Sequence, residues 1–272
     1  MTTVNFLGFQ ASRLIVGGNP FMGFSYIQER VSRDEMLDYY TIDRIIKDLK
    51  YAETLGYTHY INTCDEYTRR FHRQYRNEGG KLGWIAQTHS PQLIRTSTNI
   101  AIEGGACAYF HQGSVGDGFM EQKQYDVFRA ELDDMRRANI PIGIATHVPE
   151  HIMIQEEKNF GVDFYMACCH NLRKGKEGRL SSSVTGKKDE EYDFRRKDRE
   201  EMFKVVRQLN KPCIAYKILG GGTYINGPED TKALFKETYD NIKPGDIATV
   251  GVFQRDRDQL KENAEILKEL GI

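Results

Sequence analysis

The chain has 272 residues and a formal net charge of −1, from 38 basic and 39 acidic side chains. This even balance gives no electrostatic reason to expect nucleic acid or an anionic membrane surface as a partner. Hydrophobic residues make up 39% of the chain, which is enough for a sizeable core, and no apolar run approaches the ~20 residues of a membrane span. A disordered protein and a membrane-spanning protein are therefore both excluded.

The start of the chain and the cysteines indicate the compartment. No basic segment followed by an apolar one is found near the N-terminus, so no export signal is visible. The five cysteines are odd in number and lie mainly in apolar runs. We therefore expect a cytoplasmic protein with reduced, mostly buried thiols.

The first elements are two short runs, 4–7 and 9–13, which we expect to form a hairpin that plugs the bottom of a barrel. Eight apolar runs rich in β-branched and aromatic residues follow, on average about 33 residues apart, the length of one strand–helix unit. The eight runs cover residues 14–18, 59–62, 84–89, 106–111, 142–147, 162–168, 212–217 and 247–251.

The stretches between these runs have apolar residues at helical spacing, most clearly at 32–55, 125–139, 198–209 and 256–270. Apolar strands alternating with helices indicate a parallel sheet covered by helices. Eight repeats in one chain favour a closed barrel over an open sheet, so we expect an α/β fold of the (β/α)8 TIM-barrel class. We expect residues 1–272 to form one domain.

One stretch, residues 171–199, interrupts the repeat after the sixth run. It is rich in Lys, Arg, Asp, Glu and Ser, and we expect a long polar loop there. Such a loop is either a solvated excursion or a lid over an active site, since barrels build their sites from loops at the C-terminal ends of the strands.

Histidines follow four consecutive predicted strands, the third to the sixth. They are His89, His111, His147 and His170. Because the C-terminal ends of barrel strands converge on one mouth, we expect these side chains to surround one cavity. Neutral imidazoles there can bind a divalent transition metal, with Asp65 or Glu66 adding an oxygen ligand. Alternatively, one or two imidazoles polarise a carbonyl and transfer a proton.

Lys217 ends the seventh run and is followed by three glycines at 220–222. A lysine at this position is an anion contact or, if desolvated, a Schiff-base nucleophile. Consecutive glycines either let backbone amides approach a phosphate or form a flexible turn.

Several motifs, in their order along the chain, resemble the aldo-keto reductase superfamily. Residues 7–18 are similar to that family's N-terminal hairpin and first strand, and residues 62–67 (NTCDEY) to its DTAxxYG motif. Residues 132–147 resemble its fourth helix and fifth strand, and residues 250–263 its C-terminal dinucleotide-binding segment. The resemblance implies a TIM barrel of aldo-keto reductase type that reduces a carbonyl substrate with NADPH.

The resemblance also implies catalytic residues. The family's tetrad of Asp, Tyr, Lys and His corresponds here to Asn62, Tyr67, His89 and His111. In this scheme Tyr67 gives the proton, His111 orients the substrate carbonyl and His89 tunes Tyr67. Asn62 and His89 replace a permanently charged pair of the family, and a protonated His89 would partly substitute for it.

The cofactor residues follow in the same way. Tyr216 falls where the family stacks a tyrosine on the nicotinamide ring, and Gly251 lies in the dinucleotide segment. Glu262 and Asn263 match the pair that contacts adenine. The positions that hold the nicotinamide carboxamide in the family are occupied here by Ala145, Thr146 and Met166. The alanine and the methionine cannot make those hydrogen bonds.

Three functions remain open from the sequence. The first is an NADP-dependent carbonyl reductase with an altered tetrad. The second is a cofactor-independent or metal-assisted lyase, isomerase or hydrolase that acts on a sugar-like polar substrate. Its metal ligands would come from His89, His111, His147, His170 and Asp65. The third is a non-enzymatic role as a ligand sensor or subunit.

Overall fold

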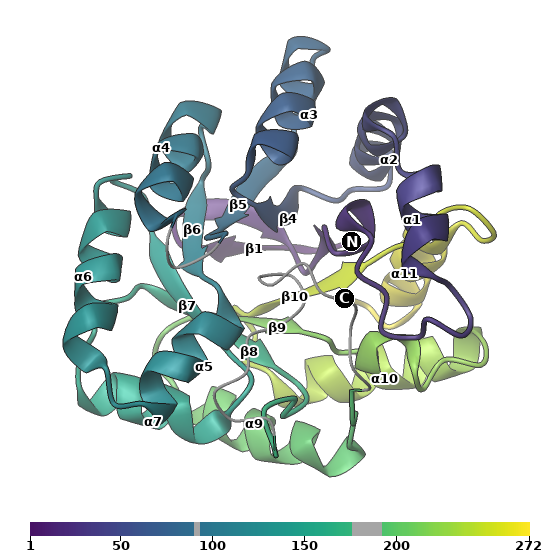
Figure 1. Ribbon diagram of the computed structural model, residues 1–272. Helices are drawn as coiled ribbons and strands as arrows, with labels where there is room; N and C mark the ends of the chain where they lie inside the picture. Colours follow the sequence, from purple (N-terminus) through teal and green to yellow (C-terminus); the bar gives the residue numbers. More distant parts are fainter. Residues whose placement is uncertain (90–92, 176–191) are drawn as a thin grey trace.

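The computed structural model describes residues 1–89, 93–175 and 192–272. Eight parallel strands close into a barrel with helices around the outside, which confirms the predicted (β/α)8 TIM barrel (Figure 1). The ring closes where the last strand pairs with the first. The barrel strands are β3 (Leu14–Gly17), β4 (His59–Thr63), β5 (Gly83–Gln87), β6 (Ala108–His111), β7 (Ile142–Thr146), β8 (Phe164–Cys168), β9 (Cys213–Tyr216) and β10 (Ile247–Gly251).

Helices form the outer layer, and polar caps fix where several of them begin. The Ser32 side chain accepts from the Glu35 amide at the start of α1, and Asp65 accepts from the Thr68 amide, 2.7 Å away, at the start of α3. The helices are α1 (Arg33–Tyr39), α2 (Ile42–Thr54), α3 (Glu66–Asn77), α4 (Ile94–Gly104), α5 (Gly113–Glu121), α6 (Tyr125–Arg136), α7 (Pro149–Glu157), α9 (Arg196–Gln208), α10 (Pro228–Asn241) and α11 (Gln259–Glu269), with short 3-10 turns η1 (Pro20–Met22) and η3 (Gly220–Gly222).

Side chains alternate along each strand between the barrel interior and the helical layer. In β6, Ala108 and Phe110 belong to the interior cluster, whereas Tyr109 packs in the cluster between strands and helices. Both faces are covered, so both carry buried side chains. A residue one position after an inward-facing side chain therefore faces the helices, and this alternation decides which predicted site residues reach the barrel mouth.

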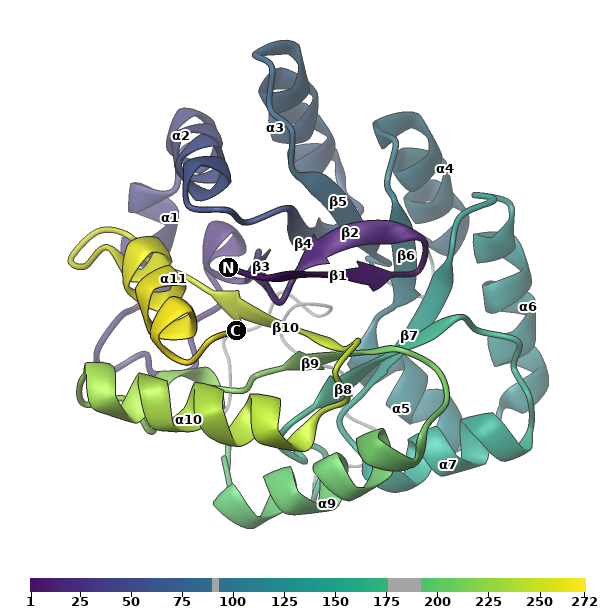
Figure 2. The ribbon, with the colours of Figure 1, turned by 180° about the vertical axis from the view of Figure 1, so that it is seen from behind.

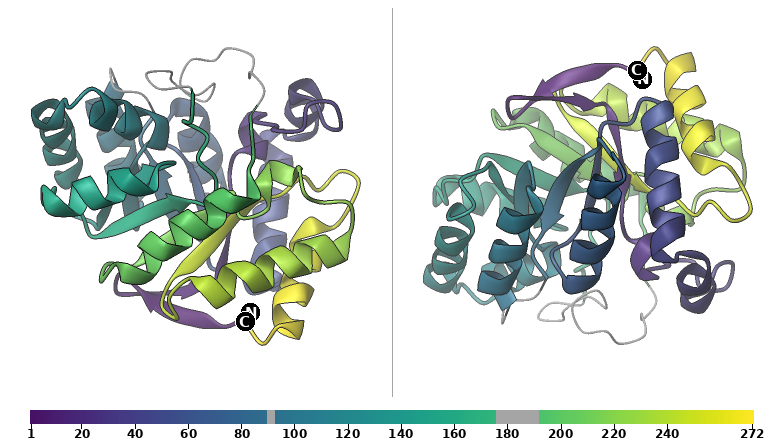
Figure 3. Two further views of the ribbon diagram at one scale, coloured as in Figure 1. Left: turned by 90° about the horizontal axis from the view of Figure 1, so that it is seen from below. Right: turned by 90° about the horizontal axis from the view of Figure 1, so that it is seen from above.

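The N-terminal hairpin closes the end of the barrel at which the strands begin. It consists of β1 (Thr3–Phe6) and β2 (Phe9–Ser12), which pair antiparallel. Figure 2 shows it lying across the barrel, and the side views in Figure 3 place it at one end. Phe6 is fully buried, and its ring centroid lies 6.1 Å from that of Phe164 inside the barrel. The hairpin therefore plugs the barrel, as predicted.

The predicted polar loop at 171–199 lies in part outside the described residues. Its described flanks, 171–175 and 192–195, contain no helix or strand, and α9 begins at Arg196. None of the described helices is long and apolar enough to cross a membrane.

Replacing Gly143 with alanine is expected to lower the free energy of unfolding by about 1–3 kcal/mol. A Cβ atom on Gly143, in β7, would lie 2.6 Å from the ring of Phe164, which is rigid and fully buried. Gly118→Ala is the matched control, because a Cβ atom there meets nothing within 4 Å. Since Gly118 lies within α5, that change should raise stability by up to about 1 kcal/mol. Equal urea midpoints for the two variants would contradict this account of the barrel interior.

Candidate active site

The C-terminal mouth of the barrel holds a cavity of about 780 Å³, within the usual size range of small-molecule and cofactor sites. Each strand contributes an inward-facing residue from near its C-terminal end, and the resulting floor is mostly apolar. These residues are Gly17, Ile61, Gln87, Phe110, Ala145, Met166, Tyr216 and Thr249. The ionisable side chains that reach this cavity are therefore the ones to consider for chemistry.

His147 follows β7 and lines the cavity. Its Nδ1 atom lies 2.8 Å from Oδ2 of Asp117, and its Nε2 atom lies 3.4 Å from Nζ of Lys217. Because the carboxylate is an acceptor, Nδ1 carries the proton and the lone pair on Nε2 points to Lys217. His147 is thus held in one tautomer, with its basic nitrogen on the cavity side.

Asp117 lies on α5, has no exposed surface, and is surrounded by donors. It accepts from the backbone amide of His147 (3.1 Å), from Nδ1 of His151 (2.8 Å) and from the hydroxyl of Thr146. Burial alone would raise the pKa of Asp117, but the hydrogen bonds from His147 and His151 outweigh it and hold the pKa below its ordinary range. The carboxylate is therefore ionised at neutral pH.

The pKa of His147 is lowered, first by burial and then by the ammonium group of Lys217, although Asp117 opposes the shift. The imidazole is consequently neutral at neutral pH and available to accept a proton or a hydrogen bond.

Lys217 follows β9 with φ of 54°, in the left-handed region that is uncommon for a lysine. Such backbone strain is concentrated at functional sites. Its Nζ atom lies 5.0 Å from the ring centroid of Tyr26 and 5.1 Å from that of Tyr216. Burial disfavours the ammonium form, but the Tyr26 phenol and the Cys168 thiol more than offset burial and raise the pKa of Lys217. Lys217 is therefore a cation at the cavity wall.

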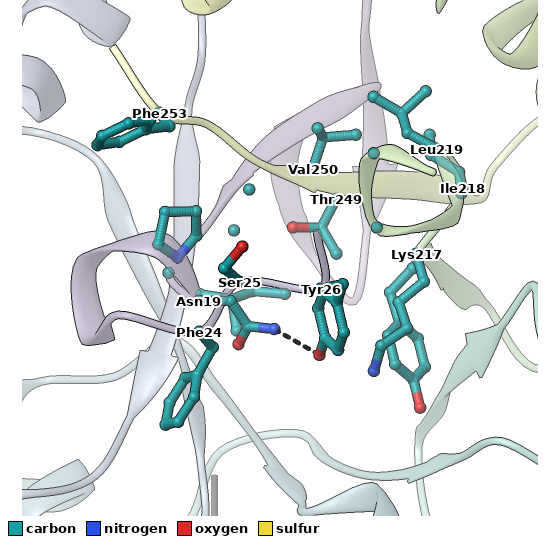
Figure 4. Close-up of a pocket in the computed structure, with 18 of the residues that line it drawn as sticks. Asn19, Phe24, Ser25, Tyr26, Lys217, Ile218, Leu219, Thr249, Val250 and Phe253 are labelled. Carbon is teal, nitrogen blue, oxygen red and sulfur yellow. Dashed lines mark hydrogen bonds between the residues drawn. The ribbon is translucent and has the colours of Figure 1, made fainter. Parts of the chain in front are cut away.

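Tyr26 lies in the loop after η1, beside Lys217 (Figure 4). Its hydroxyl accepts a hydrogen bond from Nδ2 of Asn19, 3.1 Å away, and both residues line the cavity. Asp117, His147, Lys217 and Tyr26 together are the four residue types of the tetrad that the family resemblance implies. They stand, however, at other positions of the chain.

All four predicted cofactor residues line this same cavity. Tyr216 is on its floor, Gly251 ends β10, and the other two lie on α11. Asn263 is buried, and Glu262 forms an ion pair of 2.7 Å with Arg257. The cavity thus extends without a break from the ionisable cluster to the adenine positions implied by the resemblance.

Two of the three glycine amides after Lys217 already have backbone acceptors and are not open to a phosphate. The amide of Gly220 donates to the carbonyl of Lys217 (2.9 Å), and that of Gly222 donates to the carbonyl of Leu219 (3.1 Å). These amides are used within the η3 turn itself.

Two predicted tetrad positions lie outside the cavity lining. Tyr67 is on α3, where its hydroxyl donates to the carbonyl of Tyr40 (3.2 Å) and burial raises its pKa. Asn62 is buried beside Gly18, and its Oδ1 atom accepts from the amide of Thr63 (2.9 Å). This geometry corrects the expectation that the residues at 62 and 67 meet the substrate.

His111 and His89, the other two tetrad positions, are also absent from the described cavity lining. His111 directly follows the inward-facing Phe110, so it points into the helical layer, where its Nε2 atom lies 2.6 Å from Glu131 on α6. His89 follows the end of β5, and its amide donates to the hydroxyl of Ser97 on α4. Strand alternation therefore separates His111 from the mouth, whereas His89 lies beyond the end of β5 and outside the described cavity lining.

His170, the last of the four predicted histidines, is also held away from the cavity. Its Nδ1 atom lies 3.1 Å from the carbonyl of Arg195, and its ring packs on Phe194, outside the cavity lining. Of the four predicted histidines, His147 alone lines the described cavity. The expectation that all four surround one cavity is therefore wrong.

The structure does not bring together the residues that were predicted as metal ligands for a metal-assisted lyase, isomerase or hydrolase. Asp65 is occupied as the N-cap of α3. Within residues 1–89, 93–175 and 192–272, no group of three or more His, Cys, Asp or Glu side chains is arranged to hold a metal ion.

Sequence reasoning missed Asp117, His151 and Tyr26. Asp117 carried one usable signal, because it is an isolated carboxylate in the otherwise small and apolar segment 113–120. An acidic side chain in such a helix is rarely buried without a partner. His151 and Tyr26 gave no comparable signal, since their roles depend on contacts between distant parts of the chain.

No known family profile and no curated protein matches this sequence. Among solved structures, apo Gox0644 is similar with a TM-score of 0.58 at 11% identity, covering 97% of this chain and 87% of that one. A point mutant of Gox0644 in complex with NADPH gives 0.59 at 12%, covering 98% and 88%. Dihydropteroate synthase from Xanthomonas albilineans with 4-aminobenzoic acid gives 0.54 at 11%, covering 100% and 98%. At such identities the likeness establishes the fold alone.

The fold and the cavity together define the class: this is a TIM-barrel protein with an Asp–His–Lys cluster at the C-terminal mouth of the barrel.

Proposed function

We propose that the chain is an NADPH-dependent carbonyl reductase whose proton chemistry is carried by Tyr26, Lys217, His147 and Asp117. The observation that carries this proposal is the single cavity that joins this cluster to the four positions implied for the dinucleotide. The crystal structure of a Gox0644 mutant with NADPH adds that a barrel of this fold is compatible with that cofactor.

The residues present fit the nicotinamide ring and the adenine, the two ends of the cofactor. Tyr216 is available to stack on the nicotinamide ring, and Glu262 and Asn263 are available to adenine. The residues that hold the nicotinamide carboxamide in the aldo-keto reductases are replaced here at 145 and 166. The amide side chains of Gln87 and Asn19 line the cavity and are available to the carboxamide instead. When bound, NADPH would supply the hydride.

The chain's own residues then handle the carbonyl oxygen. Tyr26, held by Asn19, donates its hydroxyl proton to that oxygen. The ammonium of Lys217 stabilises the negative charge that develops on the phenol oxygen. Lys217 is itself oriented by donating to Nε2 of His147.

A second candidate is a lyase or isomerase that needs no dinucleotide. Two observations favour it: Ala145 and Met166 offer nothing to a nicotinamide carboxamide, and His147 is a neutral base at the cavity wall. In this function His147 would remove a proton from carbon next to a carbonyl, and Lys217 would stabilise the resulting oxyanion.

The test pairs two tyrosines that each lose only a hydroxyl group. NADPH binding is followed by the fluorescence of the nucleotide, and NADPH oxidation is screened over a panel of aldehydes, ketones and 2-oxo acids. Tyr26→Phe should lower kcat by about 10²-fold or more, whereas Tyr67→Phe should change it by less than about twofold. Both variants should bind NADPH like the wild type.

Two outcomes would overturn the reductase proposal: no saturable NADPH binding at millimolar concentration, or loss of activity in Tyr67→Phe with full activity in Tyr26→Phe. In the first case, exchange of substrate C–H protons in D2O would support the second candidate.

A further inference from the structure

Within the part of the chain that the structure describes, the cation of Lys217 has no carboxylate partner. No acidic side chain of the described chain lies within 4.0 Å of its Nζ atom, which instead touches the rings of Tyr26 and Tyr216 and the imidazole of His147. Asp117 is linked to Lys217 only through His147, and its carboxylate already accepts from four donors. Among residues 1–89, 93–175 and 192–272, no side chain supplies an anion to this ammonium group, and a bound anion would stabilise it in the partly desolvated cavity.

The start of α5 faces the same part of the cavity. Gly113 and Ser114, its first two residues, line the cavity, and the positive end of the helix dipole lies there. A Cβ atom on Gly113 would come within 3.1 Å of both the His147 ring and the Tyr216 hydroxyl. The absence of a side chain at this position therefore lets the start of α5 pack closely against the His147 ring, whose Nε2 atom contacts Lys217.

We propose that the ammonium group of Lys217 binds the carboxylate of the substrate, and that the substrate is a short 2-oxo acid or the corresponding 2-hydroxy acid. The inference rests on the proposed reductase function. Lys217 contacts both Tyr26 and His147. An anion bound to its ammonium group would therefore lie beside Tyr26, the proposed proton donor to the substrate carbonyl. The carboxylate carbon and the reacting carbonyl must then be neighbours, as they are in a 2-oxo acid.

The apolar residues of the cavity floor indicate what kind of side chain the 2-oxo acid carries. Ile61, Phe110 and Met166 face the cavity and are apolar. A small hydrocarbon side chain on the 2-oxo acid would bury its surface there, whereas a sugar-like chain of hydroxyl groups would lose hydrogen bonds to water.

The test uses oxamate and oxamide, two unreactive probes of the same size that differ by one carboxylate. Binding is measured by calorimetry without nucleotide and with saturating NADPH. Oxamate should bind the wild type at least about tenfold more tightly than oxamide, and Lys217→Met should lower oxamate affinity at least about tenfold. Lys174→Met, which removes an exposed lysine outside the cavity lining, should leave oxamate affinity unchanged.

Gly113→Ala provides a second variant in case Lys217→Met fails to fold. It keeps every charge but forces a shift of the His147 ring or of the start of α5, beside the contact between His147 and Lys217, so it should also weaken oxamate binding about tenfold or more. Equal binding of oxamate and oxamide to the wild type, or equal loss in the Lys217 and Lys174 variants, would overturn the inference.

Failure of this inference is distinguishable from failure of the proposed function. If oxamate binding depends on Lys217 but NADPH does not bind, the carboxylate site stands and the reductase proposal falls. If NADPH binds and neutral aldehydes are reduced while oxamate does not bind, the reductase stands and the carboxylate site falls.

Discussion

Asp117→Asn is expected to lower kcat/KM for the proposed carbonyl reduction by about tenfold, because a neutral amide no longer supplies the negative charge that polarises His147 and, through it, Lys217. The backbone amide and Nδ1 of His147 both need an acceptor at one oxygen, so the NH2 group of the asparagine would face His151 and the Thr146 hydroxyl instead. His147 would keep its tautomer but lose the neighbouring negative charge. Steady-state kinetics beside NADPH affinity measure the effect, and NADPH affinity should stay within about threefold.

Asp246→Asn is the matched control for this variant. Asp246 is also buried and also accepts backbone hydrogen bonds, from the amides of Cys213 and Lys243. It precedes β10, however, and so lies at the end of the barrel opposite the cavity. Its replacement should lower stability and leave kcat/KM of the folded protein within about twofold. A similar kinetic loss in both variants would mean that Asp117 acts on folding rather than on His147.

Loss of Asp117 should also move the acidic limb of the pH–rate profile. The carboxylate raises the pKa of His147 against the lowering by burial and by Lys217. Without it the pKa of His147 falls further, so the limb that reports the neutral imidazole should shift to lower pH. A shift to higher pH would contradict the role of Asp117 in raising the pKa of His147.

Arg199→Met is expected to lower the free energy of unfolding by about 3 kcal/mol, since it leaves several buried acceptors without a donor. Arg199 lies on α9 with no exposed surface. Its guanidinium donates to the carbonyl of Ile218 (2.5 Å) and to the hydroxyl of Thr238 (3.0 Å), and so ties α9 to α10 and to the segment after Lys217. Chemical denaturation measures the change.

The control for this prediction is Arg196→Met, one helical turn earlier. Arg196 forms an ion pair of 3.2 Å with Glu237, the same carboxylate that Arg199 meets, but its side chain is 57% exposed. An exposed pair of this kind contributes less than about 1 kcal/mol. Equal destabilisation by the two substitutions would show that the ion pair, and not the buried hydrogen bonds, holds these elements together.

The barrel was predictable because its signal is local and repeated. Eight apolar runs at a regular spacing leave few folds, and the two short runs before them are too close in sequence to be anything but a hairpin. Tyr216, Gly251 and the two α11 residues came from the family resemblance. The structure places all four in the lining of one cavity, and their role in cofactor binding stays a prediction.

The ionisable cluster was predictable only in part. His147 and Lys217 end strands, so the strand-end argument reached them. His111 ends a strand as well, but β6 is buried on both faces, and apolar residues on both faces hide which side chains point inward. Asp117 is 30 residues from His147, and its pairing arises only when α5 packs beside the end of β7.

The most direct test is a crystal structure of the protein grown with NADP⁺ at millimolar concentration. The account predicts the nicotinamide ring against Tyr216, within reach of Tyr26 and Lys217, and the adenine beside Asn263 on α11. A dinucleotide bound outside the barrel mouth, or a cavity that holds only solvent under these conditions, would contradict it.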